Sequence, residues 1–271
     1  MLSPRQAFED NIRPAELLLR VYRLLENDTV HTSGEMLKSL RTTVGASDDE
    51  DLLMIYNEIF LGLVREKADM RSSNFKKASL CNLLRQAVVV ACTSLDAYLP
   101  SLLRENMPLV IKAKGRDFFP RGQQDMQEFF KELSFSLEDA LRLLIEPDDG
   151  PEFIALKILS LTSFKYLSSR KGIHVVASLL ALSSPWDQIA IKLQEDKKSL
   201  MSVIEETTKR RNDIVHRADR PQTDPSGEIQ EISYSWSKRA IDTIFHVCLA
   251  LDELVADKAK ELKTHVEAIQ V

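Results

Sequence analysis

One stretch of this chain, Ser79–Asn106, constrains the fold more than any other, because it would be apolar around most of a helix. Its apolar residues recur three or four positions apart, which is the spacing of a helix. Among them are Leu84, Val88, Ala91, Leu95 and Leu99. Further apolar side chains fill the positions between them, so such a helix must be covered on several sides. This predicts a central helix surrounded by other elements.

Composition favours helices for those other elements too. The chain of 271 residues contains only 8 glycines, whereas a fold of many short strands needs glycine-rich turns. We therefore predict an all-α helical bundle, formed by residues 1–271 as a single domain. The formal net charge is −5, so any nucleic-acid site must be a local basic patch rather than a property of the whole surface.

Start signals place two of the expected helices. Ser3 followed by Pro4 predicts one, with Gln6 closing a capping box, and Ser184 followed by Pro185 predicts another. We expect Pro100 to kink or break the central helix. A further helical pattern follows a cap at Asp48 or Asp49, and others cover 124–146, 151–170 and 174–183.

The final helix should run from about Trp236 to Ile269, after a polar loop at 217–233. Its apolar residues recur every seven positions, at Ile241, Cys248, Val255, Leu262 and Ile269. Such spacing suits either packing within the molecule or a seam between two subunits. Both alternatives remain open, because only the first half of the helix has a good second apolar row.

Other features suggest a cytoplasmic protein. The three cysteines share no short spacing, which argues against disulfides and a zinc site, and the histidines lack metal-ligand spacing. The N-terminus MLSPRQAFED lacks the pattern of a secretion signal. No apolar run approaches the roughly 18 residues of a membrane span. We expect no membrane association, bound metal or cofactor.

The stretch KRRNDIVHR, Lys209–Arg217, ends a helix expected over about Lys197–His216. Arg211 follows Thr207 by four residues and so points toward the apolar side, where a guanidinium needs a charged neighbour or a ligand. Asn212 and His216 are also four apart and lie side by side on a helix.

Several more cations surround this helix end and form a basic patch. They are Lys209, Arg210, Arg217 and Arg220. A helix C-terminus favours cations through its dipole, so these residues could be a solvated helix end. A lone histidine is also frequently structural. The combination with an inward arginine makes a binding or catalytic site the sharper hypothesis.

The hexapeptide R-N-D-I-V-H matches the R-x4-6-H signature of HEPN domains, which are helical nucleotide-binding and ribonuclease modules of toxins and phage-defence proteins. The stretch AVVVACTSLDAYLPSLLREN resembles the HEPN helix that carries an acidic residue, in particular that of the RiboL-PSP-type subgroup. The resemblance covers about 75–105 and 185–265. It implies a HEPN-type bundle, with helical additions at 1–75 and 106–184.

The resemblance implies a metal-independent endoribonuclease of toxin or phage-defence type, with one composite cleft between two protomers. Arg211 would hold the scissile phosphate. His216 would move a proton. Asn212 would orient the histidine or bind phosphate, and Asp96 would pair with Arg211. Lys209, Arg210, Arg217 and Arg220 would contact the RNA. An antitoxin or regulatory protein could control the activity.

Two other readings remain. The chain could be a non-catalytic HEPN-like module that binds a nucleotide, an RNA or a protein, or it could be a helical scaffold with an accidental motif. Helical spacing alone does not fix where Asp96 points. The nuclease reading predicts that Arg211 and His216 line a cleft, whereas the scaffold reading predicts them in solvent or in ordinary ion pairs.

Overall fold

The computed structural model describes residues 2–26, 77–118, 130–161, 164, 167–224 and 226–269. Across these ranges the chain forms helices, turns and loops, and no strand. The predicted all-α class is therefore confirmed for the described part of the chain. The helix expected after Asp48 and the break expected at 27–35 lie outside the described residues.

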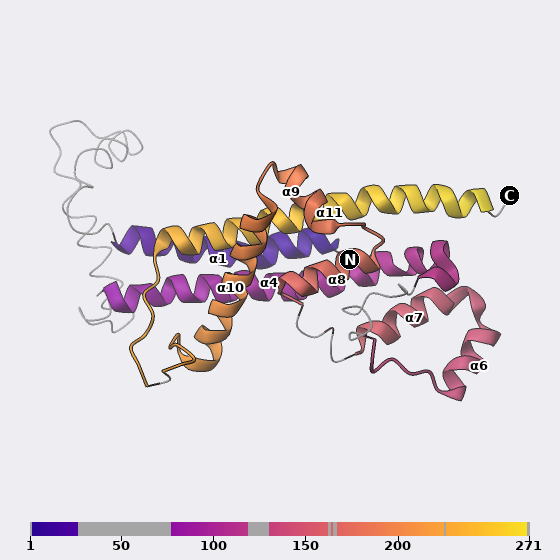
Figure 1. The fold of residues 1–271 in the computed structure, drawn as a ribbon, viewed down its shortest axis with the longest axis horizontal. Helices are drawn as coiled ribbons and strands as arrows, with labels where there is room; N and C mark the ends of the chain where they lie inside the picture. Colours follow the sequence, from indigo (N-terminus) through magenta and orange to yellow (C-terminus); the bar gives the residue numbers. More distant parts are fainter. Residues whose placement is uncertain are drawn as a thin grey trace, which may run out of the picture.

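Helix α4 (Lys77–Lys114) is the central element, as its all-round apolar pattern predicts. It packs against α1 (Pro4–Glu26) and α11 (Tyr234–Ile269), and Figure 1 shows these three helices running alongside one another. It also contacts α7 (Gly150–Leu159) and α10 (Lys197–Arg217). Leu84 and Leu99 on α4 are fully buried. The core is built around this helix.

Of the two outcomes expected at Pro100, a kink or a break, the break does not occur, because α4 continues through both Pro100 and Pro108. A proline removes one backbone hydrogen bond and crowds the preceding turn. On either side of Pro100, Leu99, Leu102 and Leu103 are buried against neighbouring helices. Tertiary packing thus holds the helix through a position that would end an isolated one.

Residues Lys77–Asp117 are long and apolar enough to meet a hydropathy criterion for a membrane span. The sequence prediction missed this because it looked for an uninterrupted apolar run, whereas the criterion tolerates isolated charges. Within the molecule, 56% of the apolar window is buried. The core helix of a soluble protein meets the same criterion, so the finding is weak evidence for a membrane location.

The capping box predicted for α1 is present. The Gln6 backbone N–H donates to Ser3 Oγ over 3.2 Å, and the Ser3 backbone N–H donates to Gln6 Oε1 over 3.1 Å. The helix carries its apolar face, including Phe8, Ile12 and Tyr22, into the core. These bonds satisfy donors that every helix start leaves without an internal acceptor.

We expect Ser3→Ala to lower the free energy of unfolding by about 1 kcal/mol, because it removes this cap. Chemical denaturation measures the change. Ser101→Ala is the control: Ser101 is exposed within α4 and its hydroxyl donates only to the Ala97 carbonyl. Alanine is the better helix former there. An equal loss at both positions would contradict the capping argument.

Shorter helices follow α4. Residues 115–117 and 147–149 form single 3₁₀ turns, η2 (Gly115–Asp117) and η3 (Pro147–Asp149). In the described part of the helix expected over 124–146, the helical segment is α6 (Leu137–Ile145), whose start Ser136 caps. Residues 130–136 form a turn and a non-helical segment, so the longer helix was wrong there.

The helix expected over 151–170 also ends early, at Leu159 in α7. Next come α8 (Arg170–Leu179), N-capped by Ser169, and α9 (Pro185–Leu193). The start predicted at Ser184-Pro185 is therefore confirmed, although Ser184 adopts a left-handed conformation and its side chain makes no cap.

The last two helices closely match their predicted ranges, α10 covering Lys197–Arg217 and α11 covering Tyr234–Ile269. Ile241, Cys248, Val255 and Leu262 of the seven-residue repeat are all buried in the core. Helix α11 packs against α1, α4, α9 and α10. Packing within the molecule thus explains the described part of the repeat.

Candidate functional site

The candidate site lies along the second half of α10, which crosses α4 in Figure 1 and contacts both α4 and α11. The Asp196 side chain caps the start of α10 by accepting from Ser199 N over 2.7 Å. The chain leaves the helix through Ala218 and Asp219, whose φ values of 49° and 64° are left-handed. These two residues turn the chain sharply and bring Asp219 back toward α4.

The structure turns Arg211 inward, as the helical spacing predicts. Arg211 Nη2 donates to Asp96 Oδ2 over 2.9 Å and to Ser168 Oγ over 2.7 Å. Asp96 Oδ1 in turn accepts from the backbone N–H groups of Ser168 and Leu167, at 2.9 and 3.2 Å. We call Arg211, Asp96 and Ser168 the Arg211 cluster. The predicted pairing of Asp96 with Arg211 is therefore present.

The Arg211 cluster is largely closed to solvent. The Arg211 and Asp96 side chains are 14% and 20% exposed, and Arg211 Nε is buried without a hydrogen-bond partner among the described residues. Cys92 lies beside them, fully buried, and burial raises its thiol pKa to about 12 even though Arg211 acts to lower it. In this conformation the guanidinium is held mainly by protein groups.

Asn212 and His216 are exposed on α10, and their spacing of four residues places them on one face. Arg211 and His216 are five residues apart, so their side chains leave the helix about 140° apart, at about 100° per residue. Asp213 and Ile214, between them, are buried. One chain thus presents Asn212 and His216 together and holds Arg211 on another side of α10.

A second buried cluster escaped the sequence analysis. The Asp219 carboxylate is fully buried and faces two guanidiniums, with Arg85 Nε at 2.6 Å and Arg210 Nε at 2.5 Å. Both arginines also donate to the Gln230 carbonyl, over 2.8 and 3.1 Å. We call Arg85, Arg210 and Asp219 the Asp219 cluster. The available signal was Arg85, the one charged residue between Lys77 and Asp96 in α4.

The remaining residues of the basic patch have separate surroundings. Lys209 is exposed. Arg217 forms an ion pair with Asp213 one turn earlier, and Arg220 Nε donates to the Gly227 carbonyl over 3.0 Å. Three of the four cations expected to contact RNA are thus held by protein groups, Arg210 among them as a member of the Asp219 cluster. Lys209 extends into solvent.

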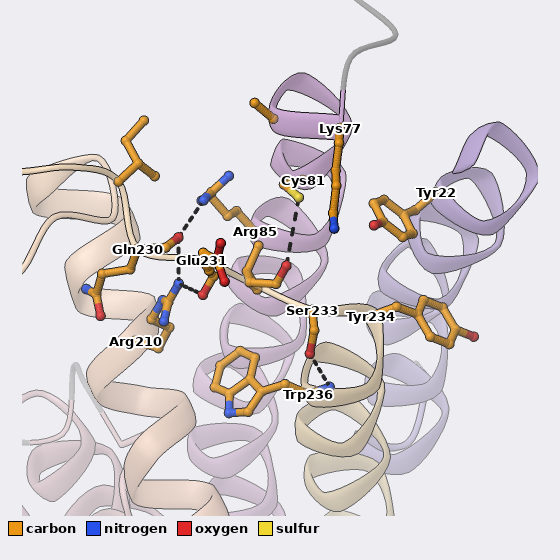
Figure 2. A pocket seen from close by; sticks show the side chains of 13 residues that line it. Tyr22, Lys77, Cys81, Arg85, Arg210, Gln230, Glu231, Ser233, Tyr234 and Trp236 are labelled. Atoms are coloured by element: carbon orange, nitrogen blue, oxygen red, sulfur yellow. Dashed lines mark hydrogen bonds between the residues drawn. The ribbon is translucent and has the colours of Figure 1, made fainter. Parts of the chain in front are cut away.

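A pocket of about 770 Å³ lies where the C-terminal part of α1, the start of α4 and the start of α11 meet the segment 229–233. Figure 2 shows Lys77, Arg85 and Arg210 around it, with Trp236 and Tyr234 from α11. Arg211 and His216 do not line this pocket. The expectation that these two residues share a cleft is therefore unmet by this pocket.

No group of three or more His, Cys, Asp or Glu side chains is placed to hold a metal ion within the described ranges. Comparison of the chain with models of known protein families, with curated proteins and with solved structures gave no significant match.

Proposed function

We propose that this protein is a metal-independent endoribonuclease of toxin or phage-defence type with a HEPN-like active site. The observation that supports this most is the ion pair between Arg211 and Asp96, which the resemblance to HEPN domains implies. The pair fixes the arginine of the R-x4-H motif at the contact between α10 and α4. The next residue, Asn212, and the motif histidine, His216, are left exposed.

In the proposed reaction, RNA supplies its own nucleophile. The 2′-hydroxyl attacks the adjacent phosphorus, the bond to the 5′-oxygen of the next nucleotide breaks, and a 2′,3′-cyclic phosphate remains. His216 transfers a proton from the attacking hydroxyl or to the leaving oxygen, a role that suits an imidazole near neutral pH. Arg211 stabilises the negative charge that develops on the phosphate oxygens.

The proposed active unit is a homodimer. Arg211 and His216 diverge by about 140° around α10, so one α10 does not direct both side chains at one phosphate. In the proposal, a second copy contributes its own motif to a composite cleft, as the resemblance to HEPN domains implies. Lys209 is exposed and could guide RNA to this face through charge. We propose action in the cytoplasm, under control of an antitoxin or regulatory protein.

A second candidate is a non-catalytic module that binds a nucleotide, an RNA or a protein. The observation that favours it is the closure of the Arg211 cluster. Arg211 Nη2 already donates to both Asp96 and Ser168, and an arginine so held can act as a clamp between α10 and α4. In that case Arg211 would hold α10 against α4, and the protein would not cleave RNA.

A panel of tRNA, mRNA and rRNA incubated with the purified protein separates these candidates. The endoribonuclease proposal predicts that wild type cleaves at least one RNA, and that Arg211→Ala and His216→Ala cleave it at least about 10²-fold more slowly, provided that each variant folds as wild type does. A non-catalytic binding module would bind RNA and leave it uncut. If wild type cuts no RNA, with or without added divalent metal, and expression of both variants affects cells as wild type does, the proposal fails.

A further inference from the structure

The pocket at the start of α4 has a basic floor and wall. Arg85 and Arg210 share the single carboxylate of Asp219, which lies behind them and is fully buried. Two guanidiniums facing one carboxylate leave an excess of positive charge. Lys77 adds an exposed ammonium at the rim. Glu231 is the carboxylate among the lining residues, so the pocket and Asp219 together carry one net positive charge.

Aromatic rings form another side of the pocket. Trp236 lies in the first turn of α11, with the Arg210 guanidinium 5.8 Å from its ring centroid. Tyr234 stacks with Tyr22 of α1 at 6.2 Å between centroids. Figure 2 shows both rings below Lys77, with Trp236 on the side of Arg210 and Tyr234 on the side of Tyr22. A flat ring could therefore lie against the aromatic side while its charged end faces the cations.

The start of α11 strengthens the preference for an anion. Ser233, which lines the pocket, caps this helix by accepting from Trp236 N over 3.2 Å. A helix N-terminus carries a partial positive charge and backbone N–H groups that phosphate can use. The segment that forms this wall is held in place, since Arg85 and Arg210 both donate to the Gln230 carbonyl.

We propose that this pocket binds a free nucleoside monophosphate. Its volume of about 770 Å³ lies within the usual range for a small-molecule site. The phosphate would lie near Lys77 and the Arg210 guanidinium, with the buried Arg85 adding positive charge behind them, and the base would lie against Trp236. The site is separate from the Arg211 cluster, so the proposal is independent of ribonuclease activity.

Isothermal titration of the full-length protein tests this proposal with five probes. They are the 5′-monophosphates of adenosine and uridine, unphosphorylated adenosine, inorganic phosphate, and a 5′-phosphorylated, 2′-O-methylated RNA of ten nucleotides. We expect a nucleoside monophosphate to bind more tightly than adenosine or phosphate alone. Tighter binding of the uncleavable RNA than of both monophosphates would overturn the assignment to a free nucleotide.

Two rim variants with opposite effects sharpen the test. Lys77→Glu should weaken monophosphate binding about tenfold or more, because it replaces a charge-assisted contact with a repulsive charge. Glu231→Gln should strengthen binding, because it removes the lining carboxylate while the Glu231 backbone carbonyl still accepts from Arg210. The matched control is Lys198→Glu, an exposed lysine at the start of α10.

Lys198→Glu should leave the affinity unchanged, and circular dichroism should show that all three variants retain the helix content of wild type. The proposal is overturned if neither monophosphate binds at millimolar concentration. It is also overturned if Lys77→Glu and Lys198→Glu weaken binding equally. Each outcome of the binding experiment is compatible with either presence or absence of RNA cleavage. The binding result therefore tests the pocket separately from the ribonuclease proposal.

Discussion

Replacing His216 with alanine is expected to lower the RNA cleavage rate by about 10²- to 10⁴-fold, the usual contribution of a general acid or base. The imidazole is exposed on α10, so its removal should leave no cavity and change the free energy of unfolding by less than about 0.5 kcal/mol. The measurement is the initial rate of cleavage on the best RNA of the panel, together with a denaturation curve for each protein.

His265→Ala is the matched control, because His265 is also an exposed histidine on a helix, near the end of α11. It should cleave RNA at the wild-type rate. A His216→Ala protein that cleaves as fast as His265→Ala would show that the imidazole of His216 takes no part in the reaction. A large loss of stability in His216→Ala would instead indicate a structural role.

Asp219→Asn is expected to lower the free energy of unfolding by about 3–5 kcal/mol, the usual cost of removing one member of a buried ion pair. Asp219 is fully buried, and the change leaves Arg85 and Arg210 facing each other without a counter-charge. Asparagine preserves the shape of the side chain and tolerates the left-handed backbone of this position. The loss in the free energy of unfolding therefore reports the missing negative charge and not a change in the turn. Chemical denaturation monitored by circular dichroism provides the value.

The matched control is Asp187→Asn, which removes a carboxylate from an exposed pair with Lys197. Exposed pairs contribute about 0–1 kcal/mol. Stability losses of similar size at positions 187 and 219 would contradict the view that the Asp219 cluster holds the end of α10 and the segment 229–233 against α4.

The sequence was sufficient to predict α4 and the inward direction of Arg211, because both follow from residue spacing on a single helix. The contact between Arg211 and Asp96 required more, since it joins residues far apart in the chain. The resemblance to HEPN domains provided that pairing. Spacing could not reveal Ser168, which lies directly before Ser169, the N-cap of α8.

The Asp219 cluster lay beyond the sequence analysis for a different reason. It depends on two consecutive left-handed residues, Ala218 and Asp219, which turn the chain back so that a loop carboxylate becomes fully buried. Polar composition at 217–233 predicted a polar loop and did not indicate that one of its carboxylates is buried. Local patterns likewise could not decide between a kink and a break at Pro100, because they omit the neighbouring helices that hold α4 together.

The identity of the new RNA ends tests the central claim most directly. A 5′-labelled RNA that wild type cleaves is incubated with the protein in EDTA, and the fragment ends are analysed by mass spectrometry. The account predicts a 2′,3′-cyclic phosphate on the upstream fragment and its absence with His216→Ala. An RNA that remains intact with wild type, or one whose cleavage requires added metal, would contradict it.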